Sequence, residues 1–387
     1  MDKLHDFSGD RILNRPFGGS DRKISVEHDG TAYMLKYTER PVRRGDLSDS
    51  ALNRIAAEYI GSHVSASMGL ETQQTCLGFR NGEPVVACRD FRKPGESNMP
   101  FAEYVRGFLA ERDTGRILRL DQVYGTIRAA SNIPEELKQP SIDRFWDLFV
   151  VDALIGGSDR NKENWGFLAG PDDSLRLAPV YGFGSALLPG LTEDGIRSVM
   201  DDPVQMAKQC LLFPSPALLI GTRRGRKTGY YDLLSSGLDE NCTRALLRMA
   251  PKISMDRISR IIDETPLLSA TRRAFDKQYL ALRKSFVIDR AYRCCADRDF
   301  NQDALERIQT GHPYTEFALA DDLKSGKLIA APVTMDSLSD AELDAKLRHS
   351  FAQALRGEGR PLAEVFARLE NGLESSGIER PLAEKNF

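Results

Sequence analysis

The chain has 387 residues, 41% hydrophobic and 28% charged, which is typical of a globular protein and excludes a disordered or fibrous one. Its net charge of −3 provides no basic field for nucleic acid or an anionic membrane, so we expect neither as a direct partner. No apolar run approaches the ~18 residues that span a bilayer, and the N-terminus has no apolar segment of signal-peptide length. None of the six cysteines forms a Cys-x-x-Cys pair. We therefore expect a reduced, cytoplasmic protein, with export as an effector left open.

The first 92 residues predict a small lobe built mainly of strands. Alternating side-chain character on either side of an Asp-Gly and an Asn-Gly pair indicates two hairpins, and a run with helical spacing separates them. The expected elements are strands at 22–27 and 31–37, a helix at 50–68, and strands at 72–79 and 83–89. Residues 1–92 are thus expected to form a β-rich N-terminal lobe.

Residues 93–387 predict a larger and mostly helical lobe. The broad apolar face of residues 142–155 predicts a buried helix, and a segment rich in Gly, Asp and Asn follows over 156–190. Helical spacing then resumes and predicts further helices, including two at 343–351 and 362–373. The expected fold class is α+β, with two lobes.

Three features of the small lobe are weak when each is considered alone. Gly18, Gly19 and Ser20 precede the first hairpin, and small residues let backbone amides approach a phosphate, although a plain turn is the commoner case. Lys36 lies inside an apolar strand, where a solvated lysine is commoner than one held by an anion. Glu58 borders the apolar face of the predicted helix and could pair with Lys36, although a surface glutamate is commoner.

The loop at 156–166 is much more specific. Asp159 and Asn164 lie five positions apart directly after a hydrophobic helix. Phosphoryl transfer needs a carboxylate that accepts the proton of the substrate hydroxyl and an oxygen ligand for Mg²⁺, for which an asparagine carbonyl serves. One short segment supplies both groups, which favours a kinase over a polar turn.

The segment after the buried helix resembles the catalytic loop and metal segment of the HipA-like Ser/Thr kinases, the toxin kinases of bacterial toxin–antitoxin modules: it reads GSDRNKENWGFL and then LAPVYGFGSAL. VVACRDF at 85–91 resembles the hinge of that family, YMLKY its lysine strand and AAEYIG its glutamate helix. The resemblance runs from residue 17 to 188. It implies a two-lobed protein-kinase-like fold of the compact branch without the extra N-terminal subdomain, with its catalytic loop at 156–166 and metal segment at 178–188.

The resemblance also implies ATP and Mg²⁺ as cofactors and a role for each matching residue. Asp159 would be the catalytic base, and Asn164 would bind Mg²⁺. Lys36 would hold the α- and β-phosphates of ATP, with Glu58 as its ion-pair partner. The other cofactor-binding positions are those of the glycine-rich loop and the hinge: Gly18, Gly19, Ser20, Arg89 and Phe91.

Regulation and partners follow from the same resemblance. Family members can autophosphorylate a serine of the glycine-rich loop, which expels the loop and shuts the site, and Ser20 is the candidate here. Its phosphate would add about −1.5 to −2 charges beside the nucleotide. The implied partners are a protein substrate and an antitoxin-type protein.

Gly182 departs from the family pattern, which has aspartate here as the principal Mg²⁺ ligand. Glycine offers no carboxylate, and Asp172, Asp173 and Asp194 are not spaced to replace it. Metal-dependent transfer is therefore expected to be strongly impaired. The chain is either a natural pseudokinase or an inactivated variant of an active enzyme; retention of the other site residues favours the variant.

Two other functions and one basic run stay open. Lipid and small-molecule kinases of the phosphoinositide or aminoglycoside type share the Asp-x-x-x-x-Asn loop, although this chain has Asn161 where phosphoinositide kinases have His. A non-catalytic module could use the pocket or the helical lobe to hold a partner. The basic run at 223–227 is either a solvated loop or a contact for nucleic acid or an acidic substrate.

Overall fold

The computed structural model describes residues 4–15, 22–37, 49–108, 117–221, 225–325 and 328. All of them belong to one compact unit, Met1–Ala331; the second unit is Pro332–Phe387. No helix in the described ranges is both long and apolar enough to cross a membrane. The predicted features that lie outside the described residues are Gly18, Gly19, Ser20, Arg223, Arg224 and the helices at 343–351 and 362–373.

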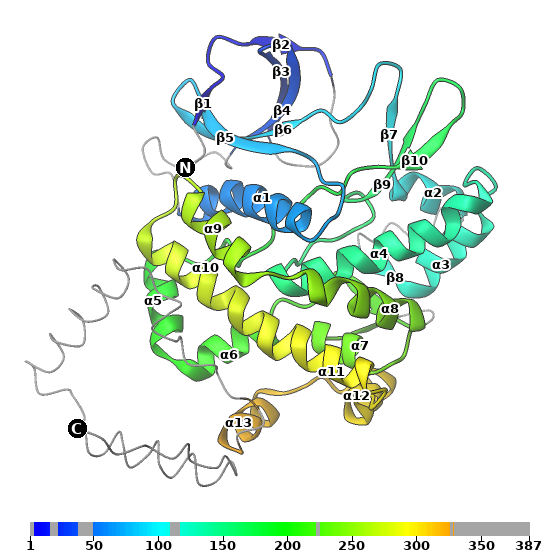
Figure 1. The fold of residues 1–387 in the computed structure, drawn as a ribbon, viewed down its shortest axis with the longest axis vertical. Coiled ribbons are helices and arrows are strands. Elements are labelled where there is room, and N and C mark those ends of the chain that lie inside the picture. Colours follow the sequence, from blue (N-terminus) through cyan, green and yellow to red (C-terminus); the bar gives the residue numbers. More distant parts are fainter. Residues whose placement is uncertain are drawn as a thin grey trace, which may run out of the picture. The chain divides into compact units, whose positions relative to one another are not determined.

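Six strands form the curled sheet of the small lobe, in the order β1-β5-β6-β4-β3-β2 (Figure 1). Neighbouring strands are antiparallel, except that β1 runs parallel to β5. The strands are β1 (His5–Asp6), β2 (Arg11–Leu13), β3 (Lys23–His28), β4 (Thr31–Tyr37), β5 (Thr75–Arg80) and β6 (Glu83–Arg89).

Both predicted hairpins are present. Their two-residue turns, Asp29-Gly30 and Asn81-Gly82, have positive φ at both positions, which is the backbone of a type I′ turn. The strand expected from residue 72 begins at Thr75, because Thr72 instead forms an isolated bridge to Val180. This bridge ties the small lobe to the metal segment.

Helix α1 (Asp49–Ser67) packs against one face of the sheet (Figure 1). Because strand side chains alternate, Val85 and Ala87 of β6 lie in a small core around Phe7, while Val86 and Cys88 lie in the main core with α1. β6 is therefore buried on both faces, and α1 is fixed between the sheet and the helical lobe.

The helical lobe surrounds α4 (Glu135–Ile155), which is buried almost throughout from Ser141 onward and begins seven residues before the helix expected at 142–155. Gly156 ends α4 at φ 69°. Two three-stranded sheets contain β7 (Ser97–Pro100), β9 (Gly166–Ala169) and β10 (Leu175–Leu177), and β8 (Leu118–Arg119), β11 (Leu218–Ile220) and β12 (Arg226–Lys227). The other α-helices are α2 (Phe101–Phe108), α3 (Leu120–Ala129), α5 (Glu193–Asp201), α6 (Pro203–Leu211), α7 (Tyr230–Ser235), α8 (Glu240–Met249), α9 (Met255–Glu264), α10 (Ala270–Arg283), α11 (Arg290–Ala296), α12 (Gln302–Thr310) and α13 (Glu316–Lys324).

Helix α10 carries a buried ion pair between Arg272 and Asp276, whose side chains are 2% and 1% exposed. Arg272 also donates to the backbone carbonyls of Leu187 and Leu188, at the end of the predicted metal segment. Burial raises the pKa of Asp276 to about 6, although Arg272 opposes the rise. Arg272 thus holds a distant loop in place, and the Asp276 carboxylate that pairs with it is buried away from water.

The raised pKa of Asp276 predicts a pH-dependent loss of stability. The folded state holds the Asp276 proton more tightly than the unfolded state does. The contribution of Asp276 to the free energy of unfolding is therefore full below about pH 4 and is lost as the pH rises through about 6. Relative to Asp276→Asn, the free energy of unfolding of the parent should fall by on the order of 3 kcal/mol across this window. Urea unfolding at pH 4, 5, 6 and 7 measures it, with Asp263→Asn as the exposed control. A difference that does not vary with pH contradicts the prediction.

Candidate active site

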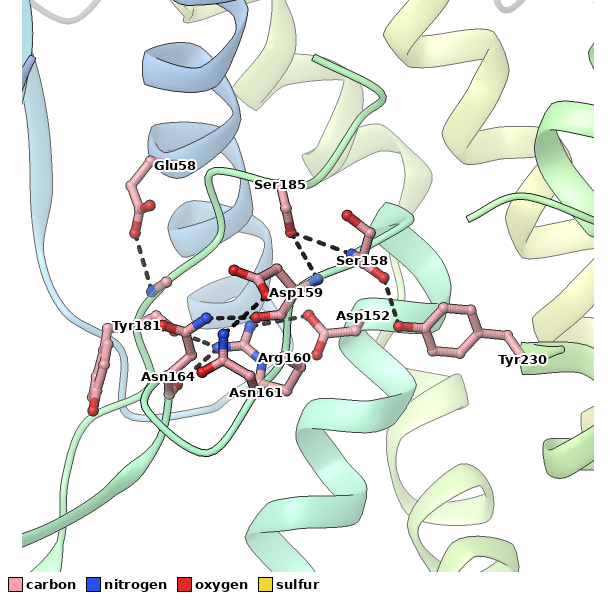
Figure 2. Close-up of polar contacts among 12 residues, drawn as sticks. Glu58, Asp152, Ser158, Asp159, Arg160, Asn161, Asn164, Tyr181, Ser185 and Tyr230 are labelled. Atoms are coloured by element: carbon pink, nitrogen blue, oxygen red, sulfur yellow. Dashed lines mark hydrogen bonds and ion pairs between the residues drawn. The ribbon is translucent and has the colours of Figure 1, made fainter. Parts of the chain in front are cut away.

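The loop after α4 is folded onto itself by its own polar groups (Figure 2). Asn164 Nδ2 donates to the Asp159 carbonyl at 2.5 Å, and Asn161 Nδ2 donates to Asp159 Oδ1 at 2.9 Å. The backbone N–H of Asn164 donates to the backbone carbonyl of Asn161 at 3.1 Å. These bonds bring Asp159 and Asn164, the two diagnostic residues of the sequence, to one end of the loop.

Arg160 anchors this loop to the lobe beneath it. Its guanidinium donates to both oxygens of Asp152 on α4, at 2.8 and 3.0 Å, and the two side chains are 8% and 3% exposed. It also donates to the carbonyls of Asn164 and Tyr181, at 2.9 and 2.5 Å. Its Cζ atom lies 4.9 Å from the centroid of the Phe183 ring, which is a cation–π contact. One buried cation therefore joins α4, the catalytic loop and the metal segment.

Lys36 and Glu58, from β4 and α1, form an ion pair with Nζ 2.9 Å from Oε2. The Glu58 carboxylate also accepts the backbone N–H groups of Gly182 at 3.1 Å and Gly184 at 2.9 Å. Burial alone would raise the pKa of Glu58, but Lys36 and the backbone amides hold it below its ordinary value. An ionised Glu58 thus links Lys36 to the predicted metal segment; Figure 2 shows the contact of Glu58 with the backbone of that segment.

Gly182 lies at the position where a carboxylate would meet Asn164. Its φ is +81°, and a Cβ placed on it would lie 3.2 Å from Asn164 Cγ and 3.3 Å from Asn164 Oδ1. The described residues contain no group of three His, Cys, Asp or Glu side chains that could hold a metal. A divalent cation here would meet the amide oxygen of Asn164 without a carboxylate at 182, so the residues present do not fit a complete Mg²⁺ site.

Two hydroxyl groups hold the start of the catalytic loop. Ser185 Oγ accepts the backbone N–H groups of Ser158 and Asp159, both at 3.2 Å. On the opposite side, the Tyr230 hydroxyl donates to the Gly157 carbonyl at 2.7 Å (Figure 2). Asp159 is therefore positioned from two directions by groups outside its own loop.

The predicted hinge residues lie beside the metal segment and the sheet. Phe91 packs against Tyr181 with ring centroids 5.8 Å apart. Arg89 Nη1 donates to Gln74 Oε1 at 2.7 Å, so its guanidinium binds a neighbouring loop of the small lobe.

Sequence reasoning missed Asp152, Ser185 and Tyr230 as parts of this site. Asp152 had a usable signal, because a carboxylate inside the apolar run FVVDALI must find a cation when that helix is buried. Ser185 and Tyr230 carried no such signal, since their bonds go to backbone groups of a distant loop.

Comparison with known proteins agrees with this geometry. No protein-family model matches the chain. It is 31% identical over 280 residues to the serine/threonine-protein kinase CtkA of Helicobacter pylori strain J99, a match covering 71% of this chain and 83% of CtkA. A crystal structure of an H. pylori proinflammatory kinase CtkA matches with a TM-score of 0.71 at 30% identity, over 77% of this chain and 100% of that one.

A second solved structure is only faintly similar. It is a complex of the Shewanella oneidensis MR-1 toxin–antitoxin system HipA, HipB and operator DNA, and its chain matches at 12% identity with a TM-score of 0.38, over 72% of this chain and 68% of that one. The relationship to CtkA decides the classification, because both its identity and its coverage are high. It also confirms the predicted α+β, kinase-like fold. The chain therefore belongs to the same family of serine/threonine protein kinases as CtkA.

Proposed function

We propose that this site transfers the γ-phosphoryl group of ATP to a serine or threonine hydroxyl of a protein, and that Gly182 strongly impairs the transfer in this exact sequence. The observation that carries the proposal is a chain of contacts from Lys36 through Glu58 to the Gly182 amide. From the neighbouring Tyr181 carbonyl it continues through Arg160 to the loop that contains Asp159 and Asn164. Groups from both lobes converge there, as a kinase requires.

Residues of this chain would perform two chemical tasks, acceptance of a proton and binding of the nucleotide. Asp159 accepts the proton of the acceptor hydroxyl while that oxygen forms a bond to the γ-phosphorus. The bond from the γ-phosphorus to its bridging oxygen breaks, and ADP leaves. Lys36 is proposed to bind the α- and β-phosphates, with Glu58 orienting its ammonium group at 2.9 Å. Gly18, Gly19 and Ser20 are proposed to cover the phosphates, and Arg89 and Phe91 to border the nucleotide.

The metal of a complete site is proposed to be Mg²⁺, held by Asn164 and by an aspartate at position 182. The direct test is transfer of labelled phosphate from ATP by the Gly182→Asp chain. A chain that transfers nothing to itself or to any protein offered would overturn the proposal. Both origins of Gly182 remain compatible with it: an inactivated variant, favoured by the retained residues, or a natural pseudokinase.

Gly182 also supports a second candidate function, a pseudokinase that binds ATP without transferring its phosphate. We expect the chain as it stands to bind ATP, and Lys36→Met to weaken the binding at least about tenfold, because the lysine supplies the phosphate-binding charge. Calorimetric titration of ATP with and without Mg²⁺ measures this, with the exposed-surface variant Lys252→Met as the control. Equal affinity of the two variants would show that Lys36 does not bind the nucleotide.

For the biological role, we propose the one that the resemblance to the HipA-like kinases implies. A toxin or effector kinase would act in the cytoplasm on a protein substrate, with an antitoxin-type partner and without direct contact with nucleic acid or membrane. Ser20 is proposed as the autophosphorylation site that shuts the pocket. The relative named a Ser/Thr-protein kinase favours protein over lipid or small-molecule acceptors.

A further inference from the structure

A pocket of about 500 Å³ opens beside Asp159. Its described lining includes Asp159, Ser158 and Ser185 but none of Lys36, Glu58 or Asn164. The groups proposed to bind ATP and metal therefore lie outside it, while the proposed base borders it. This is the place where an acceptor hydroxyl could reach Asp159.

The wall of the pocket is a strained segment held from three directions. Leu187 and Leu188 have φ of 61° and 52°, a left-handed conformation that costs a non-glycine residue roughly 1–2 kcal/mol. Arg272 on α10 donates to both of their carbonyls, and the Leu187 amide donates to Ile155. Asn53 on α1 donates to the carbonyl of Leu191, at 3.2 Å. A strained backbone that several contacts hold in place is typical of functional segments.

The pocket carries one cation and one anion among its described lining residues, Arg54 and Asp159, and the rest of that lining is uncharged. Arg54 is on α1, one turn before Glu58, and its carbonyl lies 3.7 Å from a Cβ placed on Gly184. Its side chain is exposed and forms no ion pair with any residue the structure describes. Leu188, Leu191 and Pro214 supply the apolar part of the wall. The pocket thus combines an apolar surface with a guanidinium that no described carboxylate pairs with.

We propose that this pocket binds the acceptor segment of the protein substrate and that Arg54 selects a segment with an aspartate or glutamate close to the serine or threonine. A guanidinium binds a carboxylate through two parallel hydrogen bonds, which gives both affinity and geometry. The residue that meets Asp159 is the serine or threonine that supplies the hydroxyl. The carboxylate that Arg54 binds must therefore belong to a neighbouring residue of the segment. An apolar side chain beside it would contact Leu188 and Pro214. The proposal rests on the kinase function proposed above.

Two measurements test the role of Arg54. The first uses the Gly182→Asp chain and serine peptides that differ only in Asp, Asn or Lys at one position, scanned from three residues before to three after the serine. At one position, kcat/KM should be about tenfold higher with Asp than with Asn. Arg54→Ala should remove this preference and Arg54→Glu should transfer it to Lys, while KM for ATP stays unchanged. Arg260→Ala, an exposed arginine on α9 that does not line the pocket, is the control.

The second measurement does not need activity: fluorescence anisotropy follows binding of the labelled Asp and Asn peptides to the unaltered chain and to Arg54→Ala. The Asp peptide should lose about tenfold in affinity in the variant, and the Asn peptide should lose little. If Gly182→Asp is inert with every peptide, the kinase proposal fails, but this binding difference still decides whether Arg54 reads a carboxylate. Equal binding of both peptides, or an Arg54→Ala effect confined to KM for ATP, overturns the inference.

Discussion

Replacing Gly182 by aspartate should raise the rate of phosphate transfer from ATP by at least about 100-fold. The gain is of the size associated with restoring one electrostatic group that stabilises a transition state. An aspartate Cβ at 182 would start 3.2–3.3 Å from the Asn164 side chain, so the new carboxylate and the Asn164 oxygen could share one cation. The other candidate residues already lie in place, because Glu58 holds both Lys36 and the Gly182 amide.

The backbone of Gly182 permits this change at a modest cost. Its φ of +81° suits glycine, and aspartate and asparagine are the side chains that tolerate the left-handed region best. We expect a loss of about 1 kcal/mol in the free energy of unfolding. The Cβ contact with Asn164 is tight and requires that side chain to move by a few tenths of an ångström.

Matched variants separate the carboxylate from the backbone effect. Gly182→Asn carries the same strain and shape without the charge, so it should remain near the parent rate. Asp159→Asn in the Gly182→Asp chain should remove most of the gain. The assay is transfer of labelled phosphate to a generic protein acceptor and to the chain itself, with and without Mg²⁺. A gain that persists without any divalent metal would show that the aspartate acts in another way.

The sequence could predict the parts of the fold whose signals are local. The turns Asp29-Gly30 and Asn81-Gly82 determine two hairpins through their own backbone preferences, and both are present. β1 and β2 were not predicted, because two- and three-residue strands carry too little alternation and depend on pairing with β5 and β3. Local chemistry is thus readable, while pairing across the chain is not.

The same division holds for the candidate site. The spacing of Asp159 and Asn164 indicated a kinase loop, and the structure brings the two residues into hydrogen-bond contact. The partner of Arg160 could not be read from the loop, because Asp152 lies on the preceding helix and is oriented by packing. Arg54 had no sequence signal at all, since its meaning comes from the pocket that it shares with Asp159.

The Asp152–Arg160 pair is expected to be the largest single support of the catalytic loop. Asp152→Ala leaves the guanidinium of Arg160 buried without its carboxylate, and breaking a buried pair in this way costs about 3–5 kcal/mol. Urea unfolding should show this loss, and amide hydrogen exchange should be faster from Ser158 to Asn164. Asp147→Ala is the matched control on α4, because its partner Arg248 is 37% exposed and can return to water, so a loss nearer 1 kcal/mol is expected.

A double variant distinguishes the cost of an unpaired charge from the value of the pair. Asp152→Ala with Arg160→Met removes both buried charges, so the free energy of unfolding should recover part of the loss seen with Asp152→Ala alone. The loop should nevertheless stay fast in hydrogen exchange, because methionine cannot donate to the carbonyls of Asn164 and Tyr181. Recovery of stability without recovery of the loop would assign Arg160 to positioning Asp159 rather than to holding the fold together. If Asp152→Ala costs no more than Asp147→Ala, the buried pair has no such role.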